Sequence, residues 1–223
     1  MLEQLRQLVV RHGAEEQQPV RFRPGTWHPW LEPHGAAHVL DSGVACANGP
    51  SGDRLISRGD LVRLRDLGGE DPDSLRDLFV AVMIWGSGTT NGRAPRYTGM
   101  ALADARLPAV LAGTRDAVRG GDLAGAYGRF HLNGVRRSFF TKWFAAVDDR
   151  GATGERALIL DVRVFRSLNA LGWTSHEVAG TRHWPTRYAA YVAAMHGWAG
   201  SLGVTAERLE WLLFHLNGRV DER

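Results

Sequence analysis

The chain has 223 residues, of which 44% are hydrophobic and 23% are charged, and its formal net charge is +3. This length allows one buried core, which could be divided into two lobes around a cleft. No stretch approaches the roughly eighteen apolar residues of a membrane span, and the charged start MLEQLRQLVVRHG is unlike a signal peptide. Cys46 is the single cysteine, which excludes an internal disulfide and cysteine-rich zinc sites. We therefore expect a cytoplasmic protein without a membrane partner.

The first part of the chain, residues 1–57, is expected to be a short helix followed by an irregular arm. Residues 2–11 have the amphipathic pattern of a helix. Residues 19–53 contain several glycines and five prolines, a composition that favours irregular structure. His28, His34 and His38 lie in this arm, but their spacing matches no standard metal-binding pattern, and we expect no metal site.

Residues 58–223 are expected to form an all-α domain. Ser57 is a suitable cap for a helix over 58–67, and apolar spacing predicts a second helix from about 73 to 85. A glycine-rich loop, 86–96, lacks the Gly-Lys-Ser/Thr of a phosphate-binding P-loop. Further helices are predicted over 98–105, 107–119, 121–131, 137–147, 162–171, 185–201 and 205–217, with a turn over 148–156. No alternating strand pattern indicates a β-hairpin.

Lys142 is the most informative single residue. The 27 basic residues comprise 26 arginines and this one lysine. Arginine can replace lysine in phosphate contacts and ion pairs, but its pKa is too high for it to act as a neutral amine nucleophile. The surrounding segment, SFFTKWF, is apolar, and burial there would favour the neutral amine. Lys142 is therefore a candidate for amine chemistry, although survival by chance is the alternative.

Residues 121–147 have the pattern of a helix-hairpin-helix, in which a tight turn containing Asn133 and Gly134 joins two helices. The start of the second helix offers free N–H groups to a phosphate, and Arg136 and Arg137 add positive charge there. The same pattern also fits a simple turn between helices. Nineteen residues beyond Lys142, Asp161 follows the apolar run ALIL, where it could cap the next helix, serve in catalysis, or both.

The run LNGV, a helix carrying Lys142 and the run LILD together resemble the helix-hairpin-helix DNA glycosylase superfamily. The segments SFFTK and ILDVRV, with Tyr188, Tyr191 and the region 207–214, are most similar to bacterial proteins of the 8-oxoguanine DNA glycosylase fold. The similarity covers about residues 75–217. Typical members have proline where this chain has Asn133, glycine where it has Arg136, and lysine at the position of Ser138, one turn before Lys142.

The resemblance implies an all-α glycosylase fold of two lobes around a cleft, acting on double-stranded DNA in the nucleoid as a monomer. It implies that Lys142 attacks the sugar of an extruded nucleotide, that Asp161 stabilises positive charge, and that a Schiff base then permits strand cleavage. Damaged or modified bases are the expected targets, with 8-oxoguanine first. No cofactor is expected beyond a structural monovalent cation at the hairpin. The DNA-binding residues would be Asn133, Gly134, Val135, Arg136, Arg137 and Ser138.

Aromatic walls are expected for a pocket that receives a flipped base. Trp85, Trp143, Trp198 and Trp211 are the candidates, each with a plain core position as the alternative. Two other functions remain open: a non-catalytic helix-hairpin-helix DNA-binding protein, and a glycosylase directed at modified phage bases. An all-helical interaction module, in which Lys142 and Asp161 are structural, is a third.

Overall fold

The computed structural model describes residues 1–88, 91–150 and 154–220 of the chain. These residues are mostly helical, as predicted. The helices are α1 (Leu2–Arg11), α2 (Pro24–Leu31), α3 (Arg58–Leu67), α4 (Pro72–Gly86), α5 (Ala94–Leu102), α6 (Leu107–Arg119), α7 (Leu123–Arg129), α8 (Arg137–Val147), α9 (Val162–Ala170), α10 (Ser175–Val178), α11 (Trp184–Leu202) and α12 (Ala206–Leu216). The predicted loop 86–96 and turn 148–156 each include residues outside the described part, 89–90 and 151–153.

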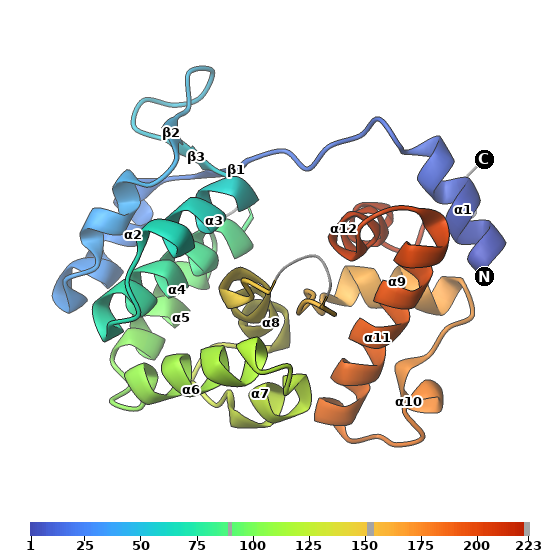
Figure 1. Cartoon of the computed structure of the whole chain (residues 1–223). Coiled ribbons are helices and arrows are strands. Elements are labelled where there is room, and N and C mark those ends of the chain that lie inside the picture. Colours follow the sequence, from blue (N-terminus) through green and yellow to red (C-terminus); the bar gives the residue numbers. More distant parts are fainter. Residues whose placement is uncertain (89–90, 151–153, 221–223) are drawn as a thin grey trace.

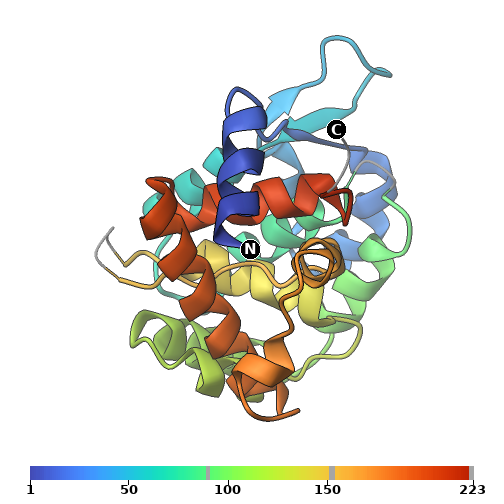
Figure 2. The ribbon, with the colours of Figure 1, turned by 90° about the vertical axis from the view of Figure 1, so that its right-hand side faces the viewer.

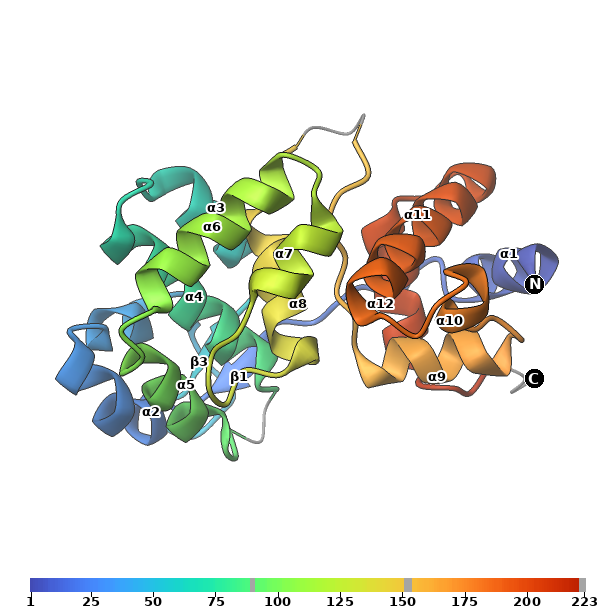
Figure 3. The same ribbon diagram turned by 90° about the horizontal axis from the view of Figure 1, so that it is seen from below.

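The helices form two groups (Figures 1 and 3). The N-terminal lobe, residues 20–147, contains α2 to α8. The C-terminal lobe contains α9 to α12 and, from the other end of the chain, α1. Figure 2 shows α1 lying across α12, where Arg208 donates a hydrogen bond to the His12 carbonyl at 2.7 Å. The chain therefore crosses between the lobes twice, after α1 and after α8.

The arm over 19–53 is more regular than predicted. It contains α2, two 3-10 helices, η1 (Glu32–His34) and η2 (Ala37–Asp41), and the strands β1 (Val20–Phe22) and β2 (Val44–Ala45). Both strands pair antiparallel with β3 (Arg54–Ile56), so the expectation of no hairpin is wrong. Pro24 is compatible with α2 because it occupies the first turn, where no N–H is needed.

The helix boundaries follow local signals that the sequence contains. Ser57 and Asp60 form a reciprocal capping box at the start of α3, as the predicted cap requires. Gly203, with a φ of +69°, ends α11 in the left-handed conformation that glycine tolerates best. Capping satisfies backbone groups that a helix end leaves unpaired, which fixes where each helix begins and ends.

The position of α8 is set by a cluster of aromatic rings at its junction with α7 and α11. Successive ring centroids in this cluster lie between 4.9 and 6.0 Å apart. Its members are Tyr127, Phe130, Phe140, Phe144 and Tyr188. Such large rings contribute much of the apolar area buried in a core, so they hold α8 of the N-terminal lobe against α11 of the C-terminal lobe.

Candidate active site

Lys142 lies in the middle of α8 and is 8% exposed. Its side chain passes directly over Gly86, the last residue of α4. A Cβ atom at position 86 would lie 2.8 Å from Cδ of Lys142, closer than real side chains approach. Glycine at this position therefore provides the space that the lysine side chain occupies.

The amine of Lys142 has two polar contacts among the described residues. Nζ donates to the Ser138 carbonyl at 2.8 Å and lies 3.5 Å from Oδ2 of Asp161. Long side chains on a helix point back toward its N-terminus, so the amine sits one turn before its own Cα. The amine thus reaches the level of Ser138.

Asp161 is presented by the extended segment 157–161, which runs between the lobes without a neighbouring strand. Buried side chains from α8, α11 and α12 bond its backbone instead. Tyr188 and Tyr191 donate to the carbonyls of Leu158 and Ile159 at 2.8 and 2.9 Å. Three N–H groups of the segment donate to side chains: Ala157 to Asp148, the residue that caps the end of α8, Ile159 to Glu210, and Leu160 to Thr141. Five separate anchors therefore fix this segment, and with it the position of Asp161.

Asp161 is also the N-cap of α9, and its side chain accepts a hydrogen bond from the backbone N–H of Arg163 at 3.0 Å. One carboxylate oxygen is used by this cap, while the other lies nearest the Lys142 amine. The capping role and a role beside the amine are compatible in this geometry, as the sequence suggested.

Electrostatics at Lys142 combine opposing effects. Burial lowers the pKa of its amine below the usual range, and the positive charge of Arg58 acts in the same direction. The carboxylates of Asp161 and Glu210 oppose this by favouring the ammonium form. Because burial disfavours the charged form, the uncharged amine of Lys142 forms more readily than that of a lysine on the surface.

A cavity of about 450 Å³ adjoins these two residues. Its walls come from both lobes and include Lys142, Asp161, Trp85 and Trp211. The volume falls within the roughly 300–1,000 Å³ typical of small-ligand sites. Two buried donors in its wall, Nε1 of Trp85 and Nε of Arg58, have no hydrogen-bond partner among the described residues. The arrangement places a primary amine, a carboxylate and unsatisfied donors around one space.

A comparison with known protein families matches residues 13–214 to the family described as "Putative 8-oxoguanine DNA glycosylase OGG-like protein". The chain belongs to this family. No curated protein and no solved structure matches it. Membership confirms the resemblance seen in the sequence and makes the chain a DNA glycosylase at the level of the family, with DNA as the substrate class. Among the described residues, none of the helices has the length and apolar character needed to cross a membrane.

The predicted hairpin of this glycosylase consists of α7, a turn and α8. Gly134 in the turn has a φ of +80°, and a Cβ there would lie 3.0 Å from the ring of Tyr97. Val135 is buried, whereas Asn133 and Arg136 are exposed. Arg137 begins α8 and Ser138 follows it. The turn is therefore packed on one side and open on the other, and its DNA-binding role stays a prediction.

The four tryptophans proposed for the base pocket divide into two pairs. Trp85 and Trp211 line the cavity beside Lys142. Trp143 is fully buried and donates to Thr114 at 3.0 Å, which is a core position. Trp198 packs edge-to-face on Trp173 at 5.6 Å and does not line the cavity.

Sequence reasoning missed Arg58 and Glu210, which also line the cavity. Glu210 is 2% exposed, ion-pairs with Arg58 at 2.9 Å, and accepts from the N–H of Ile159. Burial raises the pKa of the Glu210 carboxyl. A charged residue inside the apolar run LEWLLF was the available signal. The sequence around Arg58 contains no such signal, because its partner Glu210 lies 152 residues away.

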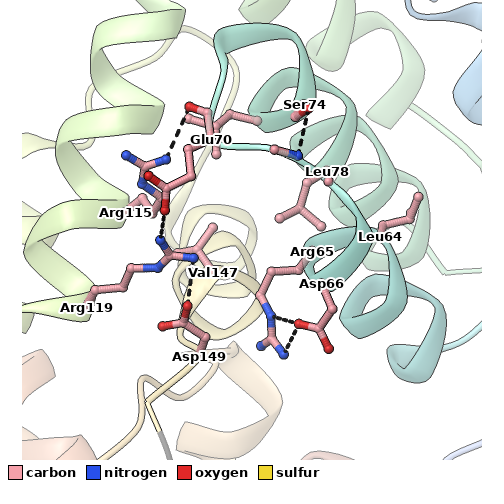
Figure 4. Close-up of a pocket in the computed structure, with 13 residues that line it drawn as sticks. Leu64, Arg65, Asp66, Glu70, Ser74, Leu78, Arg115, Arg119, Val147 and Asp149 are labelled. Carbon is pink, nitrogen blue, oxygen red and sulfur yellow. Dashed lines mark hydrogen bonds and ion pairs between the residues drawn. The ribbon is translucent and has the colours of Figure 1, made fainter.

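A second cavity, of about 300 Å³, lies between α3, α4 and α6 (Figure 4). Its charged side chains neutralise one another, since Arg119 ion-pairs with Glu70 at 2.6 Å and with Asp149 at 2.8 Å. Lys142 is not among the residues that line it. Within the described ranges, no three His, Cys, Asp or Glu side chains are grouped so as to hold a metal ion.

Proposed function

We propose that this protein is a DNA glycosylase with β-lyase activity that excises an extruded, damaged base, with 8-oxoguanine as the first candidate. The observation that carries the proposal is the buried Lys142 amine, 3.5 Å from Asp161, in the wall of a cavity between two lobes. A base stacked in a duplex is inaccessible at its sugar carbon, so the nucleotide must first leave the stack.

The proposed reaction begins with the neutral amine of Lys142. Its lone pair forms a bond to C1′ of the sugar, the bond from C1′ to the base breaks, and the base leaves with the bonding electrons and takes up a proton. The carboxylate of Asp161 stabilises the positive charge that develops on the sugar and accepts the proton released by the amine. This substitution needs no metal ion or organic cofactor.

Strand cleavage follows from the covalent intermediate. Opening of the sugar ring converts the Lys142 adduct to a Schiff base, which acidifies the proton on C2′. Loss of that proton and of the 3′-phosphate breaks the strand by elimination, and water then releases the lysine. Burial of the amine supports the first step, because it favours the uncharged nucleophile.

The test is trapping by borohydride on duplexes that carry 8-oxoguanine, deaminated bases or hypermodified bases, with base release and nicking measured separately. The wild-type protein should become covalently linked to at least one duplex. Lys142→Arg should abolish the link, because a guanidinium cannot form the Schiff base. Binding of these duplexes without trapping would favour a non-catalytic DNA-binding protein, and trapping on hypermodified bases alone would favour a phage-directed enzyme.

Asp161→Asn separates catalysis from helix capping. Asparagine caps helices as well as aspartate does, so thermal stability should change little. The loss of the negative charge should slow trapping by about 10²-fold or more. The matched control is Asp71→Asn, which alters another N-cap, at the start of α4. Equal trapping rates for the two variants would contradict a catalytic role for Asp161.

A further inference from the structure

A cluster of cations lies outside the cavity, where the first turns of α8 and α11 meet. We call this cluster, consisting of Arg137, Arg182, Trp184 and Arg187, the Trp184 cluster. Trp184 is the first residue of α11 and is half-buried. The guanidinium carbons of Arg137 and Arg187 lie 3.8 and 3.5 Å from the centre of its ring. Two cations thus share one indole ring.

These cations have no acidic counterpart. In the ranges 1–88, 91–150 and 154–220, no carboxylate lies within ion-pair distance of Arg137, Arg182 or Arg187. Arg187 donates instead to the hydroxyl of Ser175 at 3.0 Å. Partial burial, and next the positive charge of Arg137, lower the pKa of Arg187. Two guanidinium carbons this close to one ring centre must stack on opposite faces of the indole, and an anion bound beside this stack would offset the repulsion between the two cations.

The cluster lies close to the candidate active site. Arg137 precedes Lys142 by five residues on α8, about 7.5 Å along the helix axis at 1.5 Å per residue and about 140° around it at 3.6 residues per turn. Its guanidinium also lies 5.6 Å from the ring of Phe165, which follows Asp161 by one turn on α9. A DNA strand that delivers a nucleotide to Lys142 and Asp161 would therefore pass beside these arginines.

We propose that the Trp184 cluster binds backbone phosphates of the DNA strand next to the extruded nucleotide, as an extension of the hairpin surface onto α11. This inference rests on the proposed function. Planar guanidinium groups match phosphate oxygens bidentately, and their weak hydration lowers the cost of desolvation. Stacking on Trp184 holds Arg137 and Arg187 in place before DNA arrives, which reduces the entropy lost on binding.

The geometry favours DNA over a purely structural role for the stack. One arginine on Trp184 would suffice to pack the first turn of α11, whereas a second cation adds repulsion. Arg182, whose charge also lowers the pKa of Arg187, and Arg136, which precedes Arg137 in the chain, are both exposed. A phosphate backbone carries regularly spaced negative charges and neutralises several such cations at once.

The experiment measures binding of the full chain to a short duplex with a reduced abasic site, and to the same duplex without it, over about 50–200 mM salt. The slope of log K against log salt is negative, and removal of one phosphate contact reduces its magnitude by about 1. Arg187→Gln should reduce the magnitude of the salt slope in this way. It should also weaken binding to both duplexes by the same factor, because phosphate contacts do not depend on the identity of the base. Arg187→Lys should restore the slope.

Arg6→Gln is the matched control, since it removes an exposed arginine that pairs with Glu3 on α1. A wild-type slope for Arg187→Gln would overturn the inference, whether or not its melting temperature falls. If that variant keeps the wild-type slope while the wild-type protein is trapped by borohydride, the inference fails and the proposed function stands. If the wild-type protein binds neither duplex, both fail.

Discussion

At the scale of single residues, the reactivity of Lys142 depends on a balance between burial and two carboxylates. Burial favours the neutral amine, whereas Asp161 and Glu210 favour the ammonium. Asp161 is close enough to exchange a proton with the amine, while Glu210 is already bound to Arg58 and to the N–H of Ile159. Glu210 therefore acts on Lys142 through its charge and through the segment that carries Asp161.

The first prediction concerns the pH dependence of trapping. The rate should rise with pH as Lys142 loses its proton, with a midpoint below that of an ordinary lysine because burial lowers its pKa. Glu210→Gln removes a negative charge that stabilises the ammonium, so the midpoint should move to lower pH. The carbonyl oxygen of glutamine can still accept from Ile159, which preserves the backbone anchor.

Glu207→Gln is the control for this prediction, because Glu207 lies one turn earlier on α12 and pairs with Arg156 at 3.4 Å. Its midpoint should match that of the wild-type protein. A midpoint for Glu210→Gln that moves to higher pH would show that the carboxylate does not influence the amine as argued.

Single residues were predictable where one amino acid alone could do the chemistry. The unique lysine and the aspartate after an apolar run were found without a structure, and both line the cavity. Arg58 and Glu210 gain their significance only from each other across 152 positions of sequence. Such pairing depends on the fold and has no local pattern.

At the scale of elements, α3, α6 and α8 occupy the ranges that capping and apolar spacing predicted. These signals act within a few residues, so they can be read locally. The three strands are different, because Val20 pairs with Ile56 and neither segment alternates long enough to indicate a strand. The four-residue helix α10 was missed for the same reason.

The packing of α4 against α8 gives the second prediction. Gly86→Ala would place a methyl group 2.8 Å from Cδ of Lys142, so the lysine side chain must shift, which disturbs the contacts of its amine with Ser138 and Asp161. Displacement of a reacting group by about 1 Å can reduce rate by roughly 10²-fold. Trapping should fall by that order, while thermal stability changes little because alanine favours the helix.

Gly113→Ala provides the comparison. Gly113 lies inside α6, and nothing approaches within 4 Å of the position of an added Cβ. That variant should gain about 0.5–1 kcal/mol of stability and keep the wild-type trapping rate. Normal trapping in Gly86→Ala would mean that the position of the Lys142 amine does not require glycine at position 86.

At the scale of the whole molecule, the two lobes are joined because the first helix, α1, packs on the last helix, α12, in the C-terminal lobe. Leu5 and Leu8 of α1 are 0% and 3% exposed, and His215 of α12 lies 3.2 Å from Glu15 just beyond α1. The segment that then crosses between the lobes contributes Gln17 and Val20 to the cavity wall. The amphipathic pattern predicted α1 itself but could not reveal which lobe it covers.

Docking of α1 gives the last prediction. Leu5→Ala should lower the free energy of unfolding by about 2–5 kcal/mol, because it leaves a cavity in the core. Leu2→Ala alters the same helix at a position 36% exposed and should change stability by about 0.5 kcal/mol or less. Urea denaturation measures both. Because a loosened α1 also loosens the wall that contains Gln17 and Val20, Leu5→Ala should raise KM for a damaged duplex more than it lowers kcat. Equal stabilities for the two variants would mean that α1 does not pack on the C-terminal lobe.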